Sequence, residues 1–389
     1  MLSLATVVAL ASFWHAGRWL FHDDGSVWAH DYLAQWAAGR RLWEGQPALV
    51  YDWQAHEAFQ ARLIGVRDGV ELYIFYPPPF LFTTLPFAPL DFIPATLVFL
   101  LTGIAAYAAA LRMIVGTWHE ALVVALGSGG AFYCLWYTQN GFLTAAIFTA
   151  ALAVLDKRPI LAGVLIGCLT IKPQLGVLIP LALVAGGHWR TIVAATATAI
   201  GLAIAAGLLI GPGIWAAFAG SMQQTVQFLD GGNLWFKQQS IFALSLPLVG
   251  SRAAWLGHGL VAIGAAVIVM TMWRTKGVGQ SVKSSALMSA SLLVTPYLYV
   301  YDSVLLSAAA VMLLDRRTLP AVPLAERVGV FFCCALPFGA QYLFSAAVPF
   351  AAFILLYIAV RQAGRQAGDV AALGAPGRHP GVVSAEPVR

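Results

Sequence analysis

The stretch HDYLAQWAAGRRLWEGQPALVYD, from His30 to Asp52, is the densest polar passage in a very apolar chain. Its pattern predicts a short helix that begins at Asp31 and runs to Trp43, because Gly45 and Pro47 disfavour further helix. An aspartate therefore heads the helix, and two arginines lie near its end. We expect this segment to lie at the surface of a membrane and to present a reactive carboxylate.

The composition places the chain in a membrane. Of its 389 residues, 60% are hydrophobic and only 10% are charged, whereas about 25% of the residues of a soluble domain are charged. No soluble fold could bury this much apolar surface, so we expect a polytopic membrane protein. The net charge of +5 fits an excess of basic residues in cytoplasmic loops and does not indicate nucleic-acid binding. The four cysteines lie in apolar segments without zinc or redox spacing, so we interpret them as packing residues.

The apolar segments predict an all-α integral membrane bundle of about twelve helices. Several segments are shorter than the roughly 20 residues of a simple crossing, and we place these inside the bundle. The first is interpreted as an uncleaved membrane helix, because no signal-peptide cleavage site follows it. The predicted segments are 2–20, 94–112, 119–137, 141–156, 160–171, 174–187, 190–211, 253–273, 284–298, 303–314, 326–345 and 347–362.

Basic residues cluster in alternate loops, which about twelve crossings place in the cytoplasm together with both termini. The polar loops without basic clusters then lie on the outer, periplasmic or extracytoplasmic, face of the cell membrane. These loops are the long first loop at 22–93, the QNG turn at 139–141, the KPQ turn at 172–174, the loop at 212–252, and TPYLYVYD at 295–302.

Two further segments complete a single membrane domain at 1–362. Tyr76–Pro94 is apolar and rich in proline, and counting it as a crossing would place the later basic clusters outside. We therefore interpret it as an amphipathic helix in the outer interface. The segment 363–389 is rich in glycine, alanine and proline without a periodic apolar face, which predicts a disordered cytoplasmic tail.

Asp31 is the candidate for a catalytic base, because a carboxylate at the mouth of a cavity can accept a proton. Aspartate is also a preferred N-cap residue, and the two interpretations are compatible. A metal site is a weaker alternative, since no helical or turn spacing brings its candidate ligands together. Those ligands are His22, Asp23, Asp24, His30 and Asp31.

Lys172 lies in LTIKPQLG, at a break between two short apolar helices. A lysine among apolar helices is unfavourable unless it is paired or reaches the interface, so it is either an anchor or a ligand for a phosphate. Gln174 begins the next helix and could add a hydrogen bond. Arg40 and Arg41 are the other candidate phosphate ligands.

Several other polar residues occur at the predicted outer ends of apolar helices, where they could bind sugar hydroxyls. Asn-Gly turns and interfacial tyrosines are common, so each is a weak indication by itself. Asp302 is the more informative residue, because it begins an apolar segment with no basic residue near it in the sequence. The substrate-binding candidates are Tyr76, Gln139, Asn140, Gln174, Lys237, Gln238, Tyr297, Tyr301 and Asp302.

The ordered set of motifs resembles glycosyltransferase family 87, the polytopic enzymes that include polyprenol-phosphate-mannose-dependent mannosyltransferases. The motifs are D-Y-L-x-x-W-x-A-G-R with G-x-P-x-x-x-Y-D, Y-P-P-P-F, Q-N-G-F-L, A-G-V-L-I-G-x-L-x-x-K-P-Q-L-G and T-P-Y-x-x-x-Y-D, spanning about residues 28–315. The family's later motif often carries histidines, whereas the matching TPYLYVYD has none.

The resemblance implies a GT-C type bundle whose long first outer loop carries interfacial helices and, in Asp31, the catalytic base. It also implies a polyprenyl-phosphate sugar donor and an inverting transfer of a mannose-like hexose to a glycolipid or glycan hydroxyl. The candidate residues suggest no metal or other cofactor. The alternative is a transporter or flippase of a small polar or lipid-linked solute; against it, the charged groups cluster at one face instead of the bilayer midplane. A non-catalytic assembly subunit is a third possibility.

Overall fold

The computed structural model describes residues 2–17, 19–21, 30–65, 72–231, 237–314, 322–340 and 346–373, and the described chain is helical without a named strand. Its α-helices are α1 (Leu2–His15), α2 (Tyr32–Trp43), α3 (Trp53–Ile64), α4 (Phe92–Val115), α5 (Trp118–Leu126), α6 (Gly129–Trp136), α7 (Gly141–Val154), α8 (Pro159–Cys168), α9 (Ile179–Gly186), α10 (Trp189–Ala205), α11 (Ile214–Asp230), α12 (Ile241–Arg274), α13 (Gln280–Val294), α14 (Leu305–Leu313), α15 (Leu324–Ala335) and α16 (Ala347–Leu373).

Short turns of 3₁₀-helix connect these elements at the places where proline or a tight bend interrupts the chain. They are η1 (Pro47–Val50), η2 (Pro78–Thr83), η3 (Leu85–Phe87), η4 (Leu169–Ile171), η5 (Pro173–Gly176), η7 (Val300–Val304) and η9 (Leu336–Gly339), and a π-helical turn, η6 (Ala206–Ile210), extends α10.

Four described helices are long and apolar enough to cross a membrane. The best example is Trp189–Ile210, whose most apolar 18-residue stretch has a mean hydropathy of 2.2 and only 6% of its residues buried inside the protein. Large apolar side chains along it, such as Val193 and Leu208, are exposed. An apolar surface without a protein partner fits a lipid environment, so the protein is an all-helical membrane protein. The other three are Phe92–Val115, Ile241–Arg274 and Ala347–Gly368.

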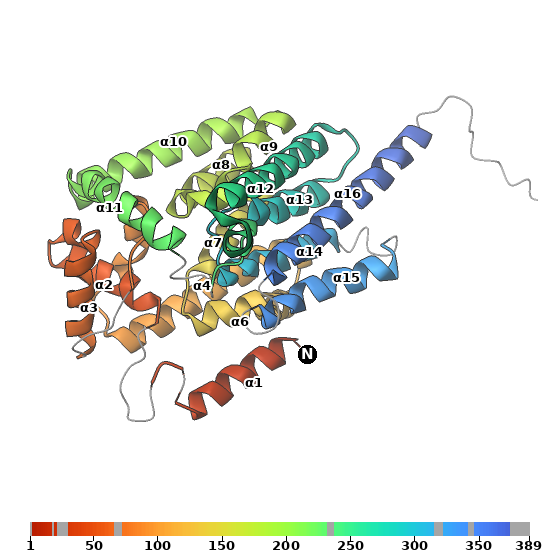
Figure 1. Ribbon diagram of the computed structural model, residues 1–389. Helices are drawn as coiled ribbons and strands as arrows, with labels where there is room; N and C mark the ends of the chain where they lie inside the picture. Colours follow the sequence, from red (N-terminus) through yellow and green to blue (C-terminus); the bar gives the residue numbers. More distant parts are fainter. Residues whose placement is uncertain are drawn as a thin grey trace, which may run out of the picture.

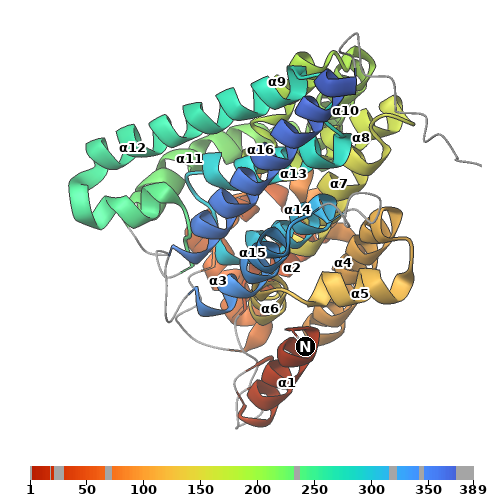
Figure 2. The same cartoon turned by 90° about the vertical axis from the view of Figure 1, so that its right-hand side faces the viewer.

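The long helices α12 and α16 run in similar directions, and α2, α3 and α11 lie together at one end of the bundle (Figures 1 and 2). Helix α2 packs on α3 at this end (left in Figure 1). Helix α11 packs on η1, the turn that connects α2 to α3. The far end holds the bends between α9 and α10 and between α12 and α13. Trp273 contacts His188 across these bends, and its indole donates to the carbonyl of Lys283.

Helix α2 confirms the predicted bounds of the helix after Asp31, but other predicted elements are wrong. The segment 119–137 is two helices, because Ser128 caps α6 by accepting a hydrogen bond from the amide of Ala131. Tyr76–Pro94 forms η2, η3 and the first residues of α4 instead of an amphipathic helix, since consecutive prolines lack amide donors. Its Phe80 is buried inside the protein. The count of about twelve crossings stays a prediction.

Two more segments are more helical than the sequence suggests. The predicted loop 212–252 contains α11 and the first part of α12, whose kink lies at Gly250, with a φ of 76°. The first part of the predicted tail is helical, since α16 continues past Ala363 and ends at Leu373. Tertiary contacts hold this extension: Arg365 pairs with Glu326 at 2.7 Å, and Gln366 accepts a hydrogen bond from the amide of Gly279. Residues 374–389 lie outside the described part.

Candidate active site

A narrow cavity, here called the central cavity, lies at the end of the bundle where α2 meets the loops before α7, after α8 and before α14. Its volume is about 70 Å³, which is room for a few water molecules. The polar side chains around it come from six segments far apart in the sequence: Asp31, Gln35, Tyr73, Tyr76, Gln139, Lys172, Gln174, Lys237, Tyr299 and Tyr301.

Asp31 directly precedes α2, but its side chain makes no capping hydrogen bond. One carboxylate oxygen instead pairs with the ammonium of Lys237 at 2.6 Å, and the other accepts a hydrogen bond from the amide of Gln139 at 3.0 Å. A carboxylate has about four lone-pair sites. Asp31 therefore retains acceptor capacity on the cavity side, and the prediction that it caps the helix is wrong.

Lys237 reaches Asp31 because its segment pairs with the chain around Tyr299. The amide of Val300 donates to the carbonyl of Lys237 at 2.8 Å, and Gln238 forms an isolated bridge with Tyr299. The ammonium group lies 4.4 Å from the centre of the Tyr137 ring, which favours a cation. Its side chain is 8% exposed, so the pair with Asp31 lies at the edge of the protein interior.

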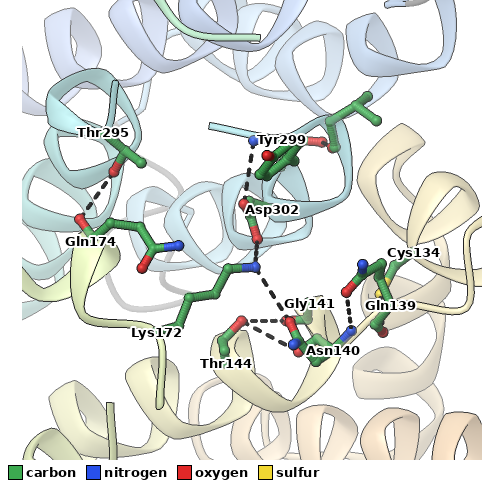
Figure 3. A network of polar contacts seen from close by, with 12 residues as sticks. Cys134, Gln139, Asn140, Gly141, Thr144, Lys172, Gln174, Thr295, Tyr299 and Asp302 are labelled. Carbon is green, nitrogen blue, oxygen red and sulfur yellow. Dashed lines mark hydrogen bonds and ion pairs between the residues drawn. The ribbon is translucent and has the colours of Figure 1, made fainter. Parts of the chain in front are cut away.

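Lys172 lines the same cavity and forms a second ion pair with Asp302, which lies behind it, and both side chains are buried. Pro173 disfavours helix at the residue before it, so η4, which follows α8, ends at Ile171 and Lys172 lies in the turn between η4 and η5. The ammonium also donates to the side-chain carbonyl of Asn140 at 3.3 Å (Figure 3). Asp302 in turn accepts a hydrogen bond from the amide of Tyr299, which fixes the turn before α14.

The turn that carries Gln139 and Asn140 packs closely against the backbone at Tyr301. A Cβ atom at Gly141 would lie 2.7 Å from the carbonyl oxygen of Tyr301, so only glycine permits this approach. Gln139 connects the two sides of the cavity: its amide donates to Asp31, and its carbonyl accepts from Gln35 and from the hydroxyl of Tyr76.

Two side chains around the cavity carry a buried polar atom that has no hydrogen-bond partner within the described chain. They are the carbonyl oxygen of Gln35 and the hydroxyl of Tyr299. Buried polar atoms are normally paired. A ligand that brings hydroxyl groups into the cavity would supply the missing partners.

An aromatic cluster of Trp53, Tyr73, Phe75 and Phe228 lies beside the cavity. The rings of Trp53 and Tyr73 are stacked, with their centres 4.1 Å apart. Two wider grooves meet the cavity at this cluster. The apolar groove, about 290 Å³, shares Phe75, Gln174 and Tyr299 with the cavity. The polar groove, about 810 Å³, shares Phe228 with it.

Comparison with known families identifies the chain. It matches glycosyltransferase family 87 over residues 73–296, which is more than half of the 389 residues. The chain belongs to this family. It is therefore a membrane glycosyltransferase, as its motifs suggest. No curated protein and no solved structure matches it.

The family match covers part of the site of this glycosyltransferase. Gln139, Asn140, Lys172 and Lys237 lie within the matched residues, whereas Asp31 and Asp302 lie outside them. The latter two are joined to the matched part by their ion pairs.

The two arginines of α2 do not reach the cavity of the glycosyltransferase. Arg41 donates to Gln46 at 2.6 Å and to the carbonyl of Ala55 at 2.7 Å, so it joins α2 to α3. Arg40 lies over the Trp36 ring and near Asp91. A helix rises about 1.5 Å per residue, which places both arginines more than ~10 Å along α2 from Asp31. Neither arginine lines the cavity, so this arrangement does not support a role for them in binding the donor phosphate.

Four predicted substrate-binding residues lie beside the cavity without lining it. Asn140 and Asp302 both contact Lys172. The buried Gln238 has an unpartnered side-chain nitrogen, and Tyr297 lines the apolar groove and packs on Phe242. Gln35 is the main omission of the sequence analysis. Its position four residues after Asp31 on a helix would have placed the two on one face.

No group of three or more His, Cys, Asp or Glu side chains within the described ranges could hold a metal ion. Three candidates of the alternative metal site, His22, Asp23 and Asp24, lie outside those ranges.

Proposed function

We propose that this glycosyltransferase moves a mannose-like hexose from a polyprenyl-phosphate donor to a hydroxyl of a glycolipid or glycan, on the outer face of the cell membrane. The single observation that carries the proposal is the placement of the Asp31 carboxylate in a cavity with two lysines. A base and two cations in one site suit a reaction in which a proton is taken up and a phosphate leaves.

Asp31 accepts the proton of the acceptor hydroxyl as that oxygen attacks the anomeric carbon. The bond from the anomeric carbon to the phosphate oxygen breaks, and its electron pair leaves with the polyprenyl phosphate. The phosphate is a good leaving group, so the step needs no general acid. A single displacement from the opposite face inverts the anomeric configuration.

Lys172 and Lys237 stabilise the charge that develops on the leaving phosphate. Each lysine carries three N–H donors, so a lysine that already pairs with a carboxylate can still bind a phosphate oxygen. Lys172 is the fixed ligand, because it is buried with Asp302 and held by Asn140. Lys237 is the movable ligand, because its pair with Asp31 is partly exposed at 8% and 12%.

Donor binding displaces side chains, since a sugar phosphate is larger than a cavity of about 70 Å³. Movement of Lys237 toward the donor phosphate widens the cavity and releases Asp31 to act as a base. The hexose hydroxyls then bind Gln35 and Tyr299, which have unpartnered atoms in the described structure.

The lipid of the donor lies in the apolar groove. Its walls are the prolines of two loops, Pro77 and Pro173, and the apolar side chains of α11, including Phe218, Met222 and Val226. Because Gln174 and Tyr299 line both the groove and the cavity, a lipid in the groove places its phosphate at the lysines.

The test uses the purified full chain with a panel of polyprenyl-phosphate hexoses, and with nucleotide sugars as the control donors. Release of polyprenyl phosphate together with a glycosylated product is expected for at least one lipid donor. Turnover of nucleotide sugars alone would refute the proposed donor. Movement of a solute or lipid-linked sugar across sealed vesicles without cleavage of a glycosidic bond would support the transporter instead.

A further inference from the structure

We propose that the polar groove is the binding site for the acceptor, and that the acceptor occupies it with a hydrophilic glycan chain of at least two hexoses. This inference rests on the proposed function and names its second substrate. The groove lies between the segment that joins η1 to α3 and one face of α11, and it meets the central cavity at Phe228.

Helix α11 separates the two grooves by the chemistry of its faces. Phe218, Met222 and Val226 are spaced four residues apart, so they share one face, and all three line the apolar groove. Gln224 and Gln227 lie on another face and line the polar groove. A helix with an apolar and a polar face separates a lipid from a water-soluble ligand.

The polar groove carries the groups that bind sugars. The amides of Gln54, Gln224 and Gln227 each present donors and acceptors to hydroxyl groups. Trp53 and Tyr51 add aromatic surface on the opposite wall, which suits the apolar faces of a hexose ring. Its volume of about 810 Å³ exceeds what one hexose needs, so we infer a glycan chain.

The exposure of these side chains fixes the medium from which the acceptor enters. Gln54, Gln224 and Gln227 are exposed, and exposed amides in contact with hydrocarbon would be strongly unfavourable. The groove therefore opens to water. Its junction at Phe228 brings the end of the glycan to the cavity that contains Asp31.

The test measures glycan binding to the purified full chain, held in a detergent without a sugar headgroup, by saturation-transfer NMR. The probes are manno- and gluco-oligosaccharides of one to four hexoses, with and without an alkyl aglycone. Affinity is expected to rise with chain length. The double variant Gln224→Leu/Gln227→Leu is expected to weaken it about 10-fold, as expected for two lost hydrogen bonds.

Gln223→Leu is the matched control, because Gln223 is exposed on the same helix but lines neither groove. Its affinity should stay within about twofold of the wild type. Where a lipid donor is turned over, the double variant should raise the acceptor KM about 10-fold and change kcat little.

The outcomes separate the two proposals. Absence of turnover with every lipid donor refutes the proposed function. The binding measurement still shows whether the polar groove binds a glycan. Three results would refute the polar groove as the acceptor site. They are undetectable binding to the wild type, an affinity that does not depend on chain length, and an equal loss of affinity in Gln223→Leu. If only the alkyl glycosides bind, the glycan is the headgroup of a lipid; if the free oligosaccharides bind equally, it is a soluble chain.

Discussion

The carboxylate of Asp31 lies 2.6 Å from the ammonium group of Lys237, although 206 residues separate them in the chain. The pair joins the first polar segment to the segment that follows α11, and it lies on the cavity shared with Lys172. In the proposed mechanism, Asp31 must be released from this pair before it accepts a proton from the acceptor hydroxyl.

Asp31→Asn is expected to lower turnover by about 100-fold, because the amide cannot accept a proton at neutral pH. Its oxygen can still accept hydrogen bonds, so donor binding and thermal stability should stay near wild type. Since Asp31 makes no capping bond, Asp31→Ala should lose activity without the stability cost of a lost cap. Asp91→Asn, at a side chain that is 94% exposed, is the control. Near-normal turnover in Asp31→Asn would remove the residue from the mechanism.

Lys172→Met is expected to destabilise the protein by about 3–5 kcal/mol, because it leaves the carboxylate of Asp302 buried without a partner. Lys172→Met/Asp302→Asn removes both charges and should recover most of the stability, since Asn can still accept from the amide of Tyr299. Turnover should stay low in both. Thermal unfolding and donor turnover, with Arg40→Met as the control, separate the two effects. A double variant with wild-type turnover would show that Lys172 has only a structural role.

Gly141→Ala is expected to displace the Gln139–Asn140 turn, because the new Cβ would meet the backbone oxygen of Tyr301 at 2.7 Å. Turnover should fall by at least about tenfold, as misplacement of aligned groups is costly. Gly201→Ala, within α10 and with no atom within 4 Å of the new Cβ, should be neutral or slightly stabilising. Comparison of turnover and melting temperature for the two variants provides the measurement. Equal turnover and melting temperature in the two variants would contradict the close approach of Gly141 to the backbone of Tyr301.

His56 predicts a loss of stability in acid. Burial lowers its pKa to about 4; its hydrogen bond to the carbonyl of Ala34 opposes this shift, and nearby Arg41 adds to it. The unfolded imidazole titrates near 6.5, so between about pH 6.5 and 4 the unfolded state binds more protons and stability falls as the pH falls. Thermal unfolding across this range should show the slope in the wild type and less of it in His56→Asn. Exposed His119→Asn should retain it.

The orientation of the bundle can be tested with single cysteines and a membrane-impermeant thiol reagent in intact cells. The basic loops predict that position 45 is labelled from outside and position 157 is not. The polar loops predicted for the outer face do meet at one cavity, which is required if they share a side. Labelling at 157 but not at 45 would refute both the orientation and the outer location of the site.

The sequence by itself determined the features that depend on local composition. Its apolar content predicts membrane helices, and the residues from Asp31 to Pro47 predict the bounds of α2, because helix propensity and capping act within a few residues. Proline also determined that the chain interrupts its helix at Lys172, and the prolines of Tyr76–Pro94 have the same effect, since 3₁₀ turns form there before α4.

Only the tertiary structure decided which polar groups meet. Asp31 and Asp302 are both aspartates at predicted outer ends of helices, yet one pairs with Lys237 and the other with Lys172. Arg40 and Arg41 follow Asp31 closely in sequence but are carried away from the cavity by the rise of α2. Such pairs depend on how helices pack, and packing depends on contacts between residues far apart in the chain, such as Gly141 against Tyr301.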